Sequence, residues 1–131
     1  MNSTERPDWT LRDAAETYAI DSWGDGYFAI NAAGHVCVRP SSDQAVELDL
    51  YEIARSLHQK NLSLPVLVRF TDILKDKVNR LNRAFVKACA KYNYTGRYTP
   101  VYPIKVNQQR QVVEGILTAD HIGLEAGSKP E

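Results

Sequence analysis

The order of hydrophobic and polar positions divides the chain near Pro65 into two segments of different pattern. The first segment begins with a helix predicted from Leu11 to about Tyr18, with Thr10 as its N-cap and Asp13 in its first turn. Two runs rich in β-forming residues follow, and a turn that contains glycine joins them, which is typical of a β-hairpin. These runs cover residues 27–31 and 35–38.

A second amphipathic helix is predicted over residues 48–59, because its hydrophobic residues recur every three or four positions. Beyond Pro65 the chain alternates between strands and helices. The predicted elements are a strand at 66–70, a helix at 71–92 capped by Thr71, a strand at 100–106, a helix at 109–117 and a strand at 122–126. This alternation with short loops is typical of a parallel α/β sheet.

We therefore expect an α/β fold in which residues 1–64 form a helix and hairpin segment and residues 65–131 form β-α-β-α-β units. Three parallel strands do not enclose a core, and the last strand would remain an open hydrophobic edge. A (β/α)8 barrel needs about 250 residues. The sequence is thus interpreted as an incomplete fragment, the amino-terminal part of a larger protein.

Charge and composition narrow the classes of function. Among 131 residues, 16 basic side chains balance 16 acidic ones, so no net field favours nucleic acid or an anionic membrane. The basic residues of helix 71–92 are accordingly interpreted as a solvated face. The polar start lacks the hydrophobic middle of a signal peptide, and no hydrophobic run of about 18 residues could span a bilayer. We expect a cytoplasmic protein in which Cys37 and Cys89 are reduced thiols.

Lys105 is the residue that most suggests chemistry. It falls near the carboxyl end of the predicted strand 100–106, where α/β barrels place their catalytic groups. In a poorly solvated cavity the ammonium form would be disfavoured, and the free amine could attack an aldehyde. Spacing alone nevertheless favours the alternative, in which Lys105 only extends from a strand end to water.

Two motifs favour a catalytic role of Lys105 over this alternative. Residues 101–108 resemble the cofactor-lysine motif of the fold-type III enzymes that use pyridoxal phosphate (PLP), because Tyr102 precedes Lys105 by three positions and Asn107 follows it by two. A lysine and an asparagine alone would be a weak signal.

The second motif lies on the next predicted strand. Residues 123–131 resemble the acidic-x-x-Ser-x-x-Glu segment of the same enzymes, with Glu125, Ser128 and Glu131 at the matching positions. Glu125 stands where ornithine and diaminopimelate decarboxylases commonly have aspartate. The wider sequence resembles the opening of biosynthetic arginine decarboxylases, in residues 23–31, 34–35, 64–67, 81–85 and 102–108.

This resemblance implies the start of an alanine-racemase-like (β/α)8 barrel, preceded by a segment that joins a separate β domain. It implies that Lys105 is the catalytic lysine that binds PLP, and that Asn107, Glu125 and Ser128 line the cofactor site. The implied reaction converts L-arginine to agmatine and CO2 in putrescine and spermidine biosynthesis, in a homo-oligomer. The 131 residues alone are expected to be inactive, and the hairpin to be poorly anchored, because its partner strands would be missing.

Magnesium is a further cofactor that the resemblance implies, but the sequence assigns it no residues. None of His35, His58 and His121 has metal-ligand spacing with another histidine and a carboxylate. No metal site is therefore predicted, and each histidine is interpreted as structural or as a surface residue.

Other interpretations stay open. The protein could be another fold-type III enzyme, such as diaminopimelate or ornithine decarboxylase or a racemase, because substrate-reading residues are expected beyond Glu131. It could also be a non-catalytic α/β binding module in which Lys105 is an ordinary polar residue. Asn107 could serve as a helix cap, and Glu131 as an acidic residue in the first turn of a helix.

Overall fold

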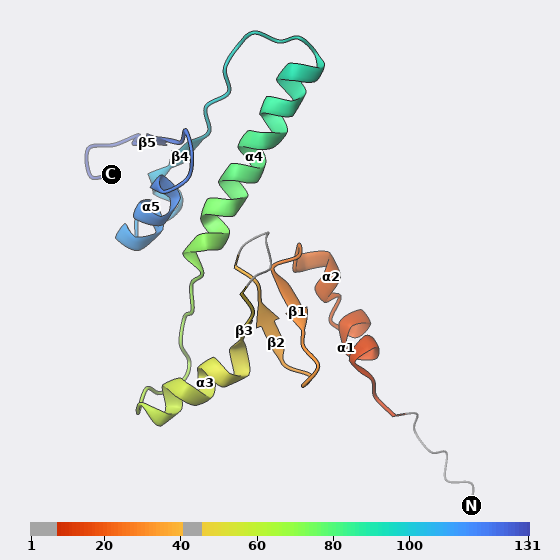
Figure 1. Ribbon diagram of the computed structural model, residues 1–131. Coiled ribbons are helices and arrows are strands. Elements are labelled where there is room, and N and C mark those ends of the chain that lie inside the picture. The colour runs from red at the N-terminus through yellow and green to blue at the C-terminus, as the bar shows by residue number, and fades with distance from the viewer. Residues whose placement is uncertain (1–7, 41–45) are drawn as a thin grey trace, which may run out of the picture. The chain divides into compact units, whose positions relative to one another are not determined.

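The computed structural model describes residues 8–40 and 46–131, and the chain forms two compact units, Met1–Leu67 and Val68–Glu131 (Figure 1). The first unit contains two short helices, a small sheet and a longer helix. The second contains two helices and a pair of strands. The fold is thus mixed α/β, as predicted.

Helix α1 (Leu11–Thr17) begins as the sequence predicts. The Thr10 hydroxyl accepts a hydrogen bond from Asp13 N at 3.2 Å, and the Asp13 carboxylate accepts one from Thr10 N at 2.8 Å. This reciprocal capping box satisfies main-chain groups that a helix end leaves free. A one-turn helix that was not predicted, α2 (Ile20–Trp23), follows and ends at Gly24, where a Cβ atom would lie 2.5 Å from Ile20 O.

The predicted hairpin is confirmed. Strand β1 (Phe28–Ile30) pairs antiparallel with β2 (Val36–Val38). At the turn, the Asn31 side chain accepts hydrogen bonds from the main-chain N–H groups of Ala33 and His35, each at 3.0 Å. Gly34 has a φ of 81°, a conformation that side chains with a Cβ rarely adopt.

The prediction that the hairpin would be poorly anchored is wrong. A third strand, β3 (Leu48–Asp49), pairs with β2, so β2 is the central strand of an antiparallel sheet. Cys37 and Val38 are fully buried, and Ile20 and Tyr27 are nearly so. The small core of this unit therefore lies on the strand that was expected to lack partners.

Strand β3 also shortens the helix predicted over 48–59. Helix α3 (Leu50–Gln59) begins two residues later, because Asp49 acts as its N-cap and accepts hydrogen bonds from Tyr51 N and Glu52 N at 2.9 and 3.1 Å. The residue at an N-cap has extended backbone, which allows Leu48 and Asp49 to continue the sheet.

In the second unit, helix α4 (Thr71–Lys91) leads to β4 (Val101–Pro103), a 3-10 turn (Ile104–Val106), α5 (Arg110–Leu117) and β5 (Gly123–Glu125). The parallel pairing of β4 with β5 confirms the predicted β-α-β order in this part of the chain. Helix α5 packs against α4 (Figure 1) and contributes Val112 and Ile116 to the core, next to the buried Ala119.

Two predictions at the start of this unit are wrong. Residues 66–70 do not form a strand, and Val66, Leu67 and Val68 are exposed. A strand needs a hydrogen-bonded neighbour, and the described residues place none beside this segment. Thr71 is not the cap of α4, because the N-cap is Phe70, which makes no side-chain hydrogen bond to the helix. The Thr71 side chain instead lies close to α5, since a Cβ at Gly115 would be 3.3 Å from it.

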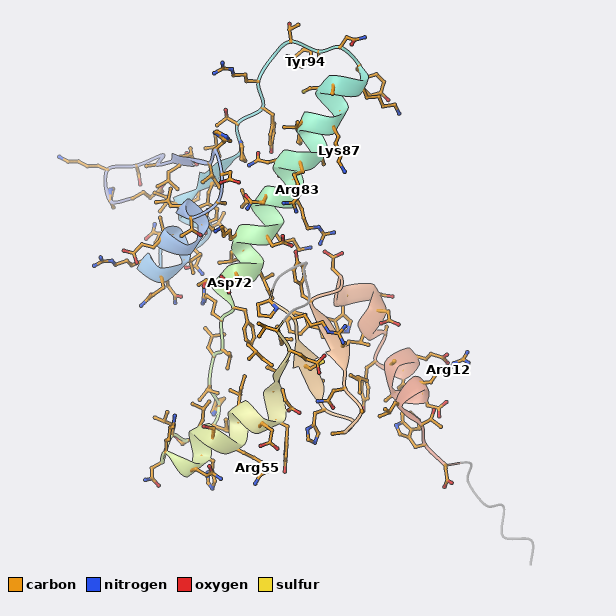
Figure 2. All side chains as sticks on the ribbon, in the orientation of Figure 1. Arg12, Arg55, Asp72, Arg83, Lys87 and Tyr94 are labelled. Carbon is orange, nitrogen blue, oxygen red and sulfur yellow. The ribbon has the colours of Figure 1, made fainter. Side chains whose placement is uncertain are left out.

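The predicted basic, solvent-exposed face of α4 is confirmed. Its basic residues are exposed, and Figure 2 labels Arg83 and Lys87 among them. On the hydrophobic face, Leu74 and Val78 are half-buried, whereas Phe85 stays 41% exposed. Among the described helices, none is long and hydrophobic enough to cross a membrane. Cys37 and Cys89 are free, in agreement with the prediction.

Candidate active site

The carboxyl ends of β4 and β5 lie at the same edge of the parallel pair. Val101, Tyr102 and Pro103 are in register with Gly123, Leu124 and Glu125, respectively. Lys105 and Asn107 follow β4 directly, and Ser128 follows β5. The four predicted site residues therefore belong to one edge of this sheet, which is where parallel α/β proteins place their ligands.

Lys105 lies in the 3-10 turn and not within the strand, so the strand predicted at 100–106 ends three residues early. Two hydrogen bonds close this turn: Asn107 N donates to Ile104 O at 3.1 Å, and the Tyr102 hydroxyl donates to Asn107 O at 3.2 Å. The aromatic residue three positions before the lysine and the asparagine two positions after it thus hold the two ends of the turn together.

Lys105 is exposed, so the expectation of a lysine in a buried strand is wrong for this chain. Within the described residues, β4 and β5 form a two-stranded pair. No hydrogen bond or ion pair within the described residues joins Lys105 to Glu125 or Ser128. The sheet brings these residues to one edge without placing them in direct polar contact.

Asn107 shapes the loop between the lysine turn and α5. Its side-chain oxygen accepts a hydrogen bond from Gln109 N at 3.0 Å, and Gln109 is the N-cap residue of α5. The alternative in which Asn107 caps α5 is therefore wrong, because the N-cap is Gln109 and Asn107 binds the N–H of that residue and not one inside the helix.

The loop after β5 is organised around the Glu131 carboxylate. Its two oxygens accept hydrogen bonds from Gly127 N at 2.9 Å and from the Ser128 hydroxyl at 3.1 Å. A Cβ at Gly127 would lie 3.0 Å from a Glu125 carboxylate oxygen, so glycine leaves room for that side chain. Sequence reasoning matched Glu131 to the motif but did not assign it this role, and it missed Gly127. The spacing Gly-Ser-x-x-Glu is the signal that could have indicated such a turn.

A cavity of about 310 Å³ lies between the lysine turn and the turn at Glu131. Its size falls at the lower end of that of small-molecule sites. Lys105 does not line it. The lining residues are Ile104, Gln108, Arg110, Val113, Glu114, Pro130 and Glu131.

In residues 8–40 and 46–131, no group of three or more His, Cys, Asp or Glu side chains could hold a metal ion. His35 lies 2.8 Å from the Asp49 carboxylate, whereas His58 and His121 are exposed. These positions agree with the interpretation of the histidines as structural or surface residues.

Fold and site together define a mixed α/β protein with a lysine-bearing turn at the carboxyl edge of a parallel strand pair. A solved structure with a similar fold is the biosynthetic arginine decarboxylase from Campylobacter jejuni, which matches this chain over 87% of its residues and over 19% of the Campylobacter protein, with a TM-score of 0.77 and 32% sequence identity. No family model matches the sequence.

Curated relatives give the same result. The biosynthetic arginine decarboxylase of Thermosynechococcus vestitus is 50% identical in an alignment of 134 positions, gaps included, which covers 100% of this chain and 21% of the relative. Biosynthetic arginine decarboxylase 1 of Synechocystis is 52% identical and covers 94% of this chain and 18% of its own length. The recognised resemblance is confirmed: the chain is homologous, along its whole length, to biosynthetic arginine decarboxylases and spans about a fifth of their length.

Proposed function

We propose that the protein to which this sequence belongs is a PLP-dependent arginine decarboxylase, which converts L-arginine to agmatine and CO2 for polyamine biosynthesis. The observation that carries the proposal is the 50% identity over the whole chain with a biosynthetic arginine decarboxylase. The lysine motif at the end of β4 and the acidic motif at the end of β5 support it, because both lie at one sheet edge.

We also propose that β4 and β5 are consecutive strands of an alanine-racemase-like barrel, with residues 65–131 as its first units and residues 1–64 adjoining a separate β domain. The parallel, in-register pairing of β4 with β5 through α5 supports this assignment. The hydrophobic, unpaired residues Val66, Leu67 and Val68 are consistent with a strand whose neighbours come from the remaining length of the relatives.

The residues at this edge fit the cofactor. The Lys105 amine is open to solvent and has no ion pair within the described residues, so an aldehyde could reach it. Lys105 would hold PLP covalently, and Asn107, Glu125 and Ser128 would line the site. When bound, PLP supplies an electron sink for the electron pair that remains when CO2 departs. Magnesium stays a cofactor implied by the resemblance alone.

The main role of the other residues at this edge would be to hold Lys105 and the loop beside Glu125 in place. The hydrogen bond from Tyr102 to Asn107 O fixes the turn that presents Lys105. The Glu131 carboxylate holds Gly127 N and the Ser128 hydroxyl, and thereby fixes the loop beside Glu125. Fixed groups of this kind lose little freedom when a ligand binds.

Decarboxylase assays of the complete gene product on arginine, ornithine, lysine and diaminopimelate test the proposal. We expect arginine to give the highest kcat/KM, and Lys105→Ala to lower kcat by more than about 10³-fold. Lys87→Ala, at an exposed position of α4, is the matched control and should leave kcat unchanged. For residues 1–131 alone we expect no decarboxylation, because water has free access to Lys105.

A better substrate than arginine among these amino acids would refute the substrate assignment. Undiminished turnover by Lys105→Ala would refute the role of the lysine and favour the view of Lys105 as an ordinary polar residue.

A further inference from the structure

Two asparagines of α4 bind the turn that precedes β5. The Asn79 side-chain oxygen accepts a hydrogen bond from Asp120 N at 3.1 Å, and the Asn82 side-chain nitrogen donates one to Asp120 O at 2.6 Å. Residues three apart lie on the same face of a helix. Both main-chain polar groups of Asp120 are therefore satisfied by one face of α4, about 40 residues away in sequence.

This turn determines where β5 begins. Helix α5 ends at Leu117, and β5 starts at Gly123. Between them His121 has a φ of 55°, in the left-handed region that a residue with a Cβ rarely adopts. Since that conformation is unfavourable by itself, contacts with the rest of the fold must hold it. The two asparagine bonds act on the neighbouring residue, Asp120.

The start of β5 in turn sets the register of the sheet. Gly123 N donates to Pro100 O at 2.9 Å, and Glu125 then lies opposite Pro103. A strand that slips by one residue turns every side chain to the other face. A slip of β5 would therefore move Glu125 and the loop at Ser128 away from the edge that carries Lys105.

We propose that Asn79 and Asn82 are positioning residues of the candidate active site. By holding Asp120 they fix the register of β5 against β4, and through it the place of Glu125 and Ser128 relative to Lys105. The catalytic consequence rests on the proposed function, whereas the effect on β5 does not.

The two hydrogen bonds differ in direction, which provides a matched test. A carboxylate accepts hydrogen bonds but donates none. Asn79→Asp keeps the acceptor that Asp120 N requires, whereas Asn82→Asp replaces the donor with an anion that faces the Asp120 carbonyl. Asn93→Asp, just after the end of α4, makes the same chemical change at an exposed position and serves as the control.

In the complete protein we expect Asn82→Asp to speed amide hydrogen exchange of residues 120–125 by at least about tenfold, and Asn79→Asp and Asn93→Asp to stay within about twofold of wild type. Asn82→Asp should also lower kcat on arginine by at least about tenfold with KM changed less than about threefold. Covalent trapping of PLP on Lys105 should persist, because that lysine follows β4.

Equal effects of Asn79→Asp and Asn82→Asp on exchange would overturn the proposal. So would faster exchange spread over the whole protein, which indicates a general structural role. If Asn82→Asp does not fold, Asn82→Ala removes the donor without adding a charge, and unchanged exchange at 120–125 in that variant would overturn the proposal as well. A wild-type protein that fails to decarboxylate arginine refutes the proposed function, and the exchange comparison still decides the role of the asparagines.

Discussion

At the scale of single residues, Asp49 is a carboxylate whose pKa its hydrogen bonds shift strongly. One carboxylate oxygen lies 2.8 Å from His35 Nδ1 and accepts a hydrogen bond from the Asn31 amide at 2.8 Å, while the other caps α3. Partial burial would raise the pKa of Asp49, but the hydrogen bonds from His35, from the Glu52 main chain and from Asn31 outweigh it and lower the pKa from 3.8 to about 2.

This shift predicts a loss of stability in acid. Because the folded-state pKa of Asp49 is below the unfolded value, the carboxylate stabilises the fold above pH 4, and this contribution is lost as the pH falls from about 4 to about 2. Asp49→Asn should lower the free energy of unfolding at pH 7 and flatten its decrease between pH 4 and 2. Urea unfolding at several pH values measures both, with the exposed Asp21→Asn as control. An unaltered pH dependence in Asp49→Asn would contradict this account.

The candidate site was predictable in part at this scale. Because the carboxyl ends of parallel strands meet at one edge, the sequence could place Lys105, Asn107, Glu125 and Ser128 together. It could not predict that Lys105 lies exposed in a turn, or that Glu131 binds Gly127 N. Such details depend on where a strand stops and on which donors a loop brings near a carboxylate.

At the scale of elements, the sequence predicted the helices well, because short-range capping and hydrophobic spacing determine where they form. Helix α1 has its capping box, and α4 and α5 follow their hydrophobic periodicity. The prediction of a strand at 66–70 was wrong because a hydrophobic run indicates that a segment tends to be buried, and it does not show that another strand pairs with it. Strand β3 was missed because two residues form no pattern, and its pairing with β2 depends on tertiary contact.

The core of the small sheet gives a prediction with an internal control. Val38 is fully buried on β2, whereas Val36 on the same strand is 37% exposed. Val38→Ala should lower the free energy of unfolding by about 1–3 kcal/mol, since it removes buried methyl groups and leaves a cavity. Val36→Ala should lower it by less than about 1 kcal/mol. Thermal unfolding of both variants compares them, and equal losses would contradict the view that the buried Val38 contributes more to stability than the partly exposed Val36.

At the scale of the whole molecule, the chain forms two compact units and matches about a fifth of the length of its relatives. Each unit has a core of its own, around Val38 in one and around Val112 and Ile116 in the other. The second unit presents the candidate site at an open sheet edge. A water-excluded site would require residues beyond those described, which the remaining four fifths of the relatives' length could supply.

The proposed function depends on Lys105 being the lysine that binds PLP. Borohydride reduction of the complete protein, followed by peptide mapping, tests it most directly, because reduction makes the bond between cofactor and lysine permanent. We expect a pyridoxyl group on the peptide that contains Lys105. A pyridoxyl group on another lysine, or none on any, would contradict it.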